Sequence, residues 1–334
     1  MVFILPIVIL ALFIAGTTAL PPIQKLPSTD RPFVFIHVMK TGGSSLREVI
    51  STGAAEAGVP QEQVYIPCHH GLDCRTATIP ARPLSVIAGH FTWAELERGG
   101  VEQMDCMVSI RDPIDRATSC LFYFYRGAMD GVLEMTEEEF RRVALECTAC
   151  NNVAAAMLMS DLPGIGNMTV NRASLNASLS EAVFASALGN LERCVIVDHM
   201  DVSHGQIWAA WAPMFLTTWF PWVSSTGNTS IPHNNTNPQP YRLPYRLMKV
   251  LEDLNNLDVR LYNRGTELML LQLETARARG FHKRHGKGAR TEAADPEPEA
   301  DHCPGATPEL QDMIDNNERI LSKHGVSRRI LSNL

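Results

Sequence analysis

A short segment in the first sixth of the chain combines a lysine, two glycines and two serines. It lies between a predicted buried strand, residues 33–38, and a predicted helix, residues 44–57. Glycines in a strand-to-helix turn let backbone N–H groups point at one spot, and the helix N-terminus adds roughly half a positive charge there. The lysine adds a full charge and the serines add hydroxyl donors, so the segment predicts a phosphate-binding site. We call it the phosphate loop; its residues are Lys40, Thr41, Gly42, Gly43, Ser44 and Ser45.

Two further polar side chains follow predicted strands in the same way. His90 follows a predicted strand over residues 84–88, and Arg111 follows one over residues 104–110. In open parallel sheets, ligands bind beyond the carboxyl ends of the strands, so we expect these residues to converge with Lys40. Lysine and arginine bind anionic oxygens, and the ordinary pKa of histidine suits proton removal near neutrality. The set predicts transfer of a group from a phosphorylated donor.

The order of residues in the phosphate loop differs from that of nucleoside triphosphatases. In their motif the lysine follows the last glycine, so that it reaches the terminal phosphates. Here Lys40 precedes Gly42 and Gly43. The segment is therefore not the common triphosphate-binding loop.

The elements that must position these residues alternate between strands and helices. A further strand is predicted over residues 193–197. Helices are predicted over residues 113–126, 136–159 and 245–278, the last with a break near residues 255–256. This alternation predicts an α/β fold, with a central, mostly parallel sheet flanked by helices.

The N-terminal residues predict entry into the secretory pathway. Residues 2–20 carry no charge and are almost wholly apolar. Such a segment fits a membrane span of about 20 residues, and it also fits a signal peptide. We predict a membrane anchor over residues 1–20, with a cleaved signal or a buried helix as alternatives. Eight cysteines are compatible with disulfides, and four glycosylation sequons begin at Asn167, Asn176, Asn228 and Asn234.

Composition divides the rest of the chain. Residues 21–32 contain four prolines and predict a stem, residues 33–276 the catalytic domain, and residues 308–334 a terminal helix. Residues 277–307 predict a charged, proline-containing linker. Its basic part, residues 277–290, is either a solvated charge run or an attraction site for an acidic polymer. The net charge of −7 argues against a general nucleic-acid-binding protein.

Three other segments have alternative interpretations. Residues 68–74 hold two cysteines and two histidines, but their spacing matches no common zinc pattern, so a local disulfide or plain loop is preferred. Cys147 and Cys150 have the spacing of a redox motif. They lie inside a predicted helix rather than at its start, which favours structural disulfides or buried thiols. Four tryptophans in residues 207–223 predict core packing, with stacking on a sugar ring as the alternative.

Residues 37–45 resemble the phosphate loop of a known family. They read His-Val-Met-Lys-Thr-Gly-Gly-Ser-Ser, which is similar to His-Val-Pro-Lys-Thr-Gly-Gly-Thr-Ser. The latter is the loop of the Golgi carbohydrate sulfotransferases, the heparan and uronyl 2-O- and 6-O-sulfotransferase group. Met39 replaces the family's proline, which makes the turn less rigid, and Ser44 replaces a threonine while keeping the hydroxyl.

A second signature of this family is Arg-Asp-Pro followed by a serine eight residues after the arginine. Arg111 and Ser119 match it. In the family, this arginine and serine hold the 3′-phosphate of the donor. Arg116 also fits the family pattern, with an expected structural role.

The third match is Gly89-His90, which resembles the family's Gly-His pair, whose histidine is the catalytic base. Together the matches cover residues 33–126, with a looser one over residues 256–262. The resemblance implies a P-loop-like sulfotransferase fold and the donor 3′-phosphoadenosine 5′-phosphosulfate, without a metal. Lys40 would steady the leaving phosphate oxygen, the phosphate loop would cradle the 5′-phosphosulfate, and His90 would deprotonate the acceptor.

The resemblance further implies a glycosaminoglycan-like acceptor and a single-pass type II protein of the Golgi membrane with a lumenal catalytic domain. Uronic acid 2-O and hexosamine 6-O positions both stay open, as does the oligomeric state. One alternative is a lumenal kinase, in which Asp112 or Asp198 would hold magnesium. The other is a non-catalytic glycan-binding protein that keeps the fold. His37 is expected to be packed in the strand, and Glu95 and Glu97 to be exposed helix carboxylates.

Overall fold

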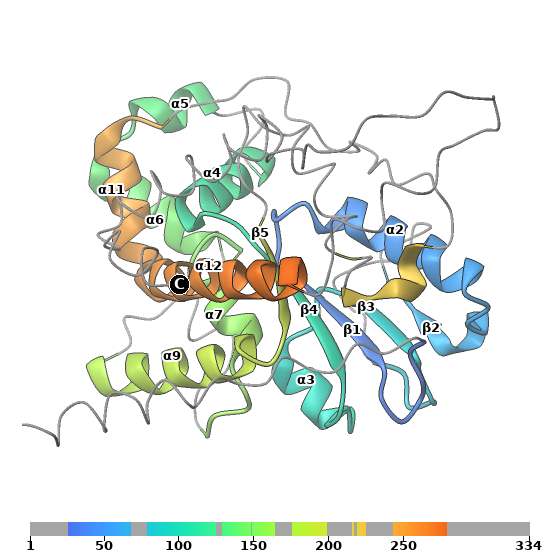
Figure 1. Ribbon diagram of the computed structural model, residues 1–334. Coiled ribbons are helices and arrows are strands. Elements are labelled where there is room, and N and C mark those ends of the chain that lie inside the picture. Colours follow the sequence, from blue (N-terminus) through green and yellow to red (C-terminus); the bar gives the residue numbers. More distant parts are fainter. Residues whose placement is uncertain are drawn as a thin grey trace, which may run out of the picture. The chain divides into compact units, whose positions relative to one another are not determined.

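In the computed structural model, five parallel strands form one sheet in the spatial order β2–β3–β1–β4–β5 (Figure 1). The predicted α/β fold with a parallel sheet flanked by helices is confirmed. Four strands lie within two residues of their predicted positions, whereas the two-residue β2 is too short to give a periodic pattern. The strands are Phe33–His37 (β1), Val64–Tyr65 (β2), Val86–Gly89 (β3), Asp105–Ile110 (β4) and Val195–Asp198 (β5).

The structure describes residues 26–67, 79–124, 129–147, 149–163, 176–198, 216, 219–224 and 243–278. All of them belong to the first of two units of the chain, Met1–Ala278. The predicted membrane anchor, the first residues of the stem, residues 68–74 and the terminal helix lie outside the described residues. So does the predicted linker after its first two residues, which are the last of a helix.

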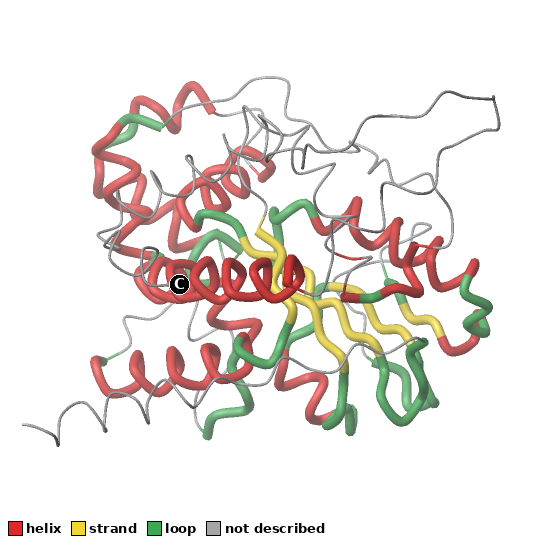
Figure 2. The backbone as a smooth tube through the Cα atoms, in the orientation of Figure 1, coloured by secondary structure: helices red, strands yellow, loops and turns green. Residues whose placement is uncertain are grey.

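Helices surround the sheet (Figures 1 and 2). The predicted helices after β1 and β4 are present, and the predicted break near residues 255–256 separates two helices at Asn255. Two 3₁₀ turns cover Gln61–Gln63 (η1) and Pro221–Ser224 (η2). The α-helices are Gly43–Glu56 (α2), Trp93–Arg98 (α3), Pro113–Phe124 (α4), Met129–Glu134 (α5), Glu137–Glu146 (α6), Val153–Leu158 (α7), Ala177–Leu191 (α9), Tyr245–Leu254 (α11) and Asn256–Ala278 (α12).

The prediction of one continuous helix over residues 136–159 is wrong. Thr136 caps α6 as expected, but the helix ends at Glu146, and Asn152 has a left-handed φ of 44° before α7 begins. The side chain of Asn152 accepts hydrogen bonds from the backbone N–H groups of Leu257 and Asp258. These hydrogen bonds to the start of α12 stabilise the break between α6 and α7. The helical pattern of the sequence gives no sign of it.

The sequon at Asn176 coincides with the start of a helix. Asn176 is the N-cap of α9, and its side-chain oxygen accepts a hydrogen bond from the N–H of Leu179. Asparagine is among the best N-cap residues, so the residue that carries the sequon can also start a helix. Asn176 is exposed, as a glycosylation acceptor requires; the other three sequons lie outside the described residues.

Side chains of β1 alternate between two hydrophobic cores, one on each face of the sheet. Val34 and Ile36 belong to the core covered by α3, α7, α9 and α12. Phe33 and Phe35 belong to the core covered by α2 and by η2 with its neighbours. This period of two is what a strand buried on both faces requires. The central position of β1 is thereby fixed by apolar packing on both sides.

The tryptophan-rich run contributes to the second core. Trp219 and Trp222 are buried, and the ring of Trp222 meets that of Phe33 edge to face, with 5.1 Å between centroids. The prediction of core packing is confirmed for these two residues, while Trp208 and Trp211 lie outside the described residues.

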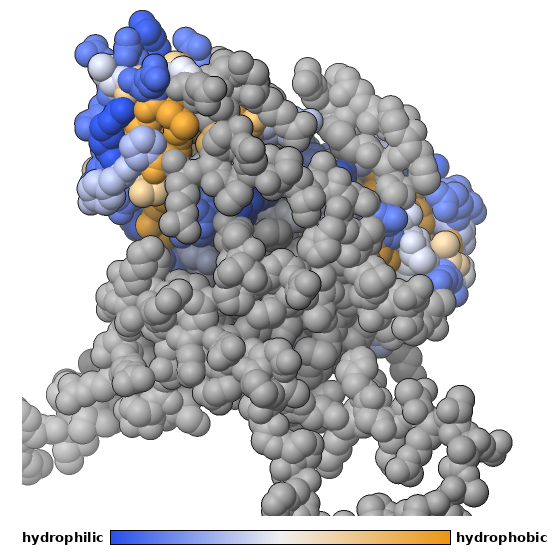
Figure 3. Space-filling model, turned by 90° about the horizontal axis from the view of Figure 1, so that it is seen from above, coloured by the Kyte–Doolittle hydropathy of each residue, from blue (hydrophilic) through white to orange (hydrophobic). Residues whose placement is uncertain are grey.

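A third cluster of buried apolar residues lies between α4, α6 and α11. On the face seen in Figure 3, hydrophilic residues cover most of the described surface, with smaller apolar areas between them. No helix within the described residues is long and apolar enough to cross a membrane.

Candidate phosphate-binding site

The phosphate loop follows the central strand of the sheet. β1 pairs with β3 on one side and with β4 on the other, with Ile36 opposite Gly89 and His37 opposite Ser109. The chain places β2 and β3 on one side of β1, and β4 and β5 on the other. The loop therefore lies where the strand order reverses, which is the position at which open α/β sheets bind ligands.

Two hydrogen bonds join residues at the ends of the neighbouring strands to the end of β1 and the start of the phosphate loop. Arg111 Nη1 donates to the carbonyl of Lys40 at 3.2 Å, and His90 Nδ1 lies 2.8 Å from the carbonyl of His37. The structure thus places His90 and Arg111 beside the backbone of His37 and Lys40, at the carboxyl ends of three adjacent strands. What they bind is a separate question.

The loop has the backbone conformation of an anion site. Lys40 and Gly42 have φ values of 66° and 74°, both in the left-handed region. Gly42 is the N-cap of α2 and supplies no side-chain cap, and no acidic residue stands in the first turn. The first N–H groups of a 14-residue helix are therefore left without a capping carboxylate or hydroxyl from these residues. An anion can accept hydrogen bonds from these N–H groups.

Glycine is required at position 43 because the ring of His37 lies against it. A Cβ atom at Gly43 would come within 2.1 Å of His37 Cδ2. The His37 ring is only 3% exposed and stacks on the His90 ring, with 4.1 Å between centroids. His37 is thus packed in the strand, as predicted. The contacts of its ring with Gly43 of the loop and with His90 are visible only in the structure.

His90 is held in one tautomer. A carbonyl oxygen can only accept, so His90 Nδ1 carries the proton that it donates to His37, and Nε2 keeps its lone pair. Burial lowers the pKa of His90 to about 4; the hydrogen bond to His37 opposes this shift, and the charge of Arg47 adds to it. Near neutral pH, His90 is therefore uncharged and able to accept a proton.

Arg47 is a residue of this site to which the sequence had given no role. It is 6% exposed, and its guanidinium donates to the carbonyl of Pro67 at 3.0 Å and to Ser44 Oγ at 3.4 Å. Its Nε has no partner, and no ion pair joins it to a carboxylate within the described residues. A buried charge is costly unless it is paired. Arg47 thus provides positive charge beside the loop that no carboxylate among the described residues pairs with.

One signal in the sequence could have indicated Arg47. It stands three residues after Ser44, and residues at this spacing lie on the same face of a helix. A basic residue one turn into the helix that follows a phosphate loop can therefore turn back toward the loop. Its burial and its lack of a carboxylate partner are visible only in the structure.

The two remaining hydroxyl-bearing residues of the loop are both buried. Thr41 is fully buried; its Oγ1 donates to the carbonyl of Val38 at 2.6 Å and lies 2.5 Å from Ser109 Oγ. Its side chain therefore braces the loop against β4. Ser45 is also buried, at 8% exposure.

Lys40 points toward α4. Its Nζ lies over the ring of Tyr123, 4.6 Å from the centroid. Ser119, the residue expected to hold a second phosphate, stands on the same helix one turn before Tyr123. The structure thus brings together the phosphate loop, Arg111 and the helix that carries Ser119.

Arg116 has the structural role that was expected of it. It is 1% exposed and donates to the carbonyls of Ala149 and Cys150 and to the side chains of Asn255 and Asp258. These bonds join α4 to the turn before α7 and to the start of α12.

The carboxylates of α3 also serve structure. Glu95 forms a capping box with Thr92. Glu97 is exposed, as predicted for a helix carboxylate, and accepts from the indole N–H of Trp93 and from Ser160. Neither carboxylate is therefore a strong candidate for contact with an acceptor.

A separate cluster of possible metal ligands lies outside the phosphate loop. Among the described residues, the group found with suitable geometry consists of Cys120, Cys147 and Cys150, all buried. Cys147 and Cys150 are bonded to each other, and they lie between α6 and α7 rather than inside one helix as predicted.

Comparison with known proteins does not extend these observations. No protein-family model matches the chain, and no curated protein matches it.

Proposed function

We propose that the protein is a carbohydrate O-sulfotransferase of the Golgi type, using 3′-phosphoadenosine 5′-phosphosulfate as donor. The observation that carries the proposal is that Lys40, His90 and Arg111 follow three adjacent strands, with Arg111 hydrogen-bonded to the carbonyl of Lys40 and His90 to that of His37. Sulfuryl transfer needs groups that bind an anion and a group that accepts a proton. Lys40 and Arg111 are of the first kind, and His90 is of the second.

The anion-binding groups suit a phosphosulfate. The loop N–H groups, Lys40 and Arg47 supply hydrogen-bond donors and positive charge at the start of α2. Arg111 and Ser119 would hold the 3′-phosphate, as the resemblance implies. Positive charge placed where negative charge develops on the leaving phosphate oxygen lowers the barrier of the reaction. No metal is required for this role.

The proton acceptor is His90. Its Nε2 would take the proton of a sugar hydroxyl while the hydroxyl oxygen attacks sulfur and the bond from sulfur to the phosphate oxygen breaks. A pKa of about 4 keeps His90 uncharged before the reaction. The same pKa makes it a weak base, and the negative charge of a bound donor would raise it toward neutrality.

The alternative of a kinase has less support. A kinase would need Asp112 or Asp198 for magnesium. Asp112 Oδ1 instead accepts N–H groups of the first turn of α4. Asp198 Oδ2 accepts the hydroxyl of Tyr262 at 2.9 Å. Both carboxylates thus already have partners within the protein.

The proposed acceptor is a glycosaminoglycan-like polysaccharide, and the proposed location is the Golgi membrane, through the N-terminal segment. Two disulfides, Cys106–Cys194 and Cys147–Cys150, fit an oxidising compartment.

A thermal-shift comparison tests the donor. A ligand at 100 times its Kd stabilises the folded protein by about 2.7 kcal/mol. Adenosine 3′,5′-bisphosphate should raise the melting temperature of the full chain, whereas ATP with Mg²⁺ should raise it less. Lys40→Met should remove the effect of the bisphosphate, and Lys249→Met, on the exposed surface of α11, should keep it. Stabilisation by ATP with Mg²⁺ alone would favour the kinase.

A further inference from the structure

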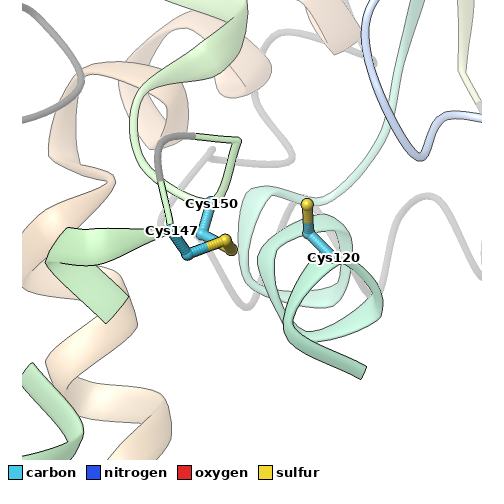
Figure 4. Close-up of side chains that lie close together, drawn as sticks. All are labelled: Cys120, Cys147 and Cys150. Atoms are coloured by element: carbon cyan, nitrogen blue, oxygen red, sulfur yellow. A yellow bond between two sulfur atoms is a disulfide. The ribbon is translucent and has the colours of Figure 1, made fainter. Parts of the chain in front are cut away.

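Three cysteines from two segments meet in the apolar cluster between α4, α6 and α11. Cys120 lies on α4, and Cys147 and Cys150 lie in the turn between α6 and α7, beside that helix (Figure 4). Their three Sγ atoms lie within 4.8 Å of one another, and all three side chains are buried. Cys147 and Cys150 form a disulfide, and Cys120 is a free thiol.

The sulfur atom of Cys120 lies at nearly the distance from those of Cys147 and Cys150 that a shared metal ion would require. Zn–S bonds are about 2.3 Å long, so two sulfur atoms on one tetrahedral zinc ion lie about 3.8 Å apart. The limit of 4.8 Å in this cluster exceeds that spacing by only about 1 Å. Two cysteines separated by two residues are also the usual paired ligands of structural zinc. Cys147 and Cys150 are bonded to each other, so after reduction their two sulfur atoms would also have to move apart to this spacing to complete a three-sulfur site.

Positive charge lies next to the cluster. Arg116 Nη2 donates to the carbonyl of Cys150 at 3.1 Å, and Arg116 is itself buried. Three thiolates around one divalent cation carry a net charge of about −1. Arg116 lies close enough to lower the cost of this charge, although it is also paired with the buried Asp258 at 3.4 Å.

We propose that Cys120, Cys147 and Cys150, when the disulfide is reduced, bind one thiophilic cation of the Zn²⁺ or Cu⁺ class. An external thiol reductant would supply two electrons and two protons to the Cys147–Cys150 bond and would itself become a disulfide. Binding of the cation would then release the three thiol protons. Soft thiolate ligands select these ions over Mg²⁺ or Ca²⁺. The site would fix α4 to the turn before α7, and it does not depend on the proposed sulfotransferase activity.

Metal binding by the reduced full chain tests the site. The chain is reduced with a phosphine under anaerobic conditions and freed of small ions. It is then titrated separately with Zn²⁺ and Cu⁺ against a chromogenic chelator. Wild type should gain one high-affinity ion that Cys120→Ser binds at least about tenfold more weakly. Cys194→Ala removes a thiol from the other described disulfide and should retain that ion.

A second readout does not require a variant that folds. In the reduced wild-type chain, the bound cation should protect Cys120 from alkylation, as measured by peptide mass spectrometry. Binding of Zn²⁺ alone would indicate a fourth ligand such as water, and binding of Cu⁺ alone would indicate trigonal coordination; both support the proposal. It is overturned if Cys120→Ser binds both ions as wild type does, or if neither ion protects Cys120.

Discussion

The uncharged state of His90 makes the stability of the protein depend on pH. Burial holds the pKa of His90 at about 4 in the folded chain, below the ordinary value of 6.5. As the pH falls below 6.5, the unfolded chain binds a proton that folded His90 does not, so acid favours unfolding. The pKa of His37, which is buried more completely, is lowered as well, so it acts in the same direction.

We expect the free energy of unfolding to fall between pH 6.5 and pH 4, with His90 contributing on the order of 3 kcal/mol of this loss. Urea unfolding at a series of pH values measures it. His90→Gln removes the titrating group, so the variant should lose less stability than wild type over the same range. Equal losses in the two proteins would contradict the assigned pKa.

Arg47 links the stability of the free protein to its affinity for anions. Arg47→Met keeps the apolar stem but removes the buried charge, and the desolvation cost of that charge disappears with it. We expect the free energy of unfolding to change by no more than about 1 kcal/mol, because the lost hydrogen bond to Pro67 offsets this gain.

Anion binding should respond differently. Hydrogen bonds to charged groups contribute about 1.5–3 kcal/mol, so Arg47→Met should bind adenosine 3′,5′-bisphosphate about 10 to 100 times more weakly. Isothermal titration calorimetry measures the affinity. Arg98→Met, on the exposed end of α3, is the control and should bind as wild type does. Unchanged affinity in Arg47→Met would exclude Arg47 from the site.

At the scale of elements, the contact between β1 and the start of α2 depends on the missing side chain at Gly43. Alanine there would place Cβ 2.1 Å from His37 Cδ2. We expect Gly43→Ala to destabilise the protein by about 1–3 kcal/mol, as overpacking of a core does.

Gly189→Ala is the matched control for this substitution. Gly189 lies in α9 with no heavy atom within 4 Å of an added Cβ, and alanine there should stabilise by about 0.5–1 kcal/mol. Chemical unfolding measures both changes. Equal effects of the two substitutions would show that the His37 ring can move aside without cost.

At this scale, some features of the fold could be predicted from the sequence and others could not. Apolar runs predicted the ranges of four strands. The rule for ligand sites in parallel sheets predicted that Lys40, His90 and Arg111 lie at the same ends of these strands. The break before α7 did not, because hydrogen bonds from α12 to Asn152 cause it, and those partners lie about a hundred residues away. The role of Arg47 also required the fold, since its burial depends on the packing of α2 against the sheet.

For the whole molecule, the described disulfides agree with the predicted secretory route. Cys106 on β4 is bonded to Cys194, the residue before β5, across a separation of 88 residues. A cross-link that closes so long a loop restricts the unfolded chain strongly. The cysteine count predicted disulfides, but the pairing depends on two strands being neighbours in the sheet.

Sulfuryl transfer itself is the most direct test of the account. The full chain is incubated with radiolabelled 3′-phosphoadenosine 5′-phosphosulfate and a panel of polysaccharides that includes heparan-like and chondroitin-like chains. We predict that wild type transfers label to at least one polysaccharide, and that His90→Gln does so about 10²–10⁴ times more slowly while still binding adenosine 3′,5′-bisphosphate. Absence of transfer to every polysaccharide, or transfer by His90→Gln at the wild-type rate, would contradict the account.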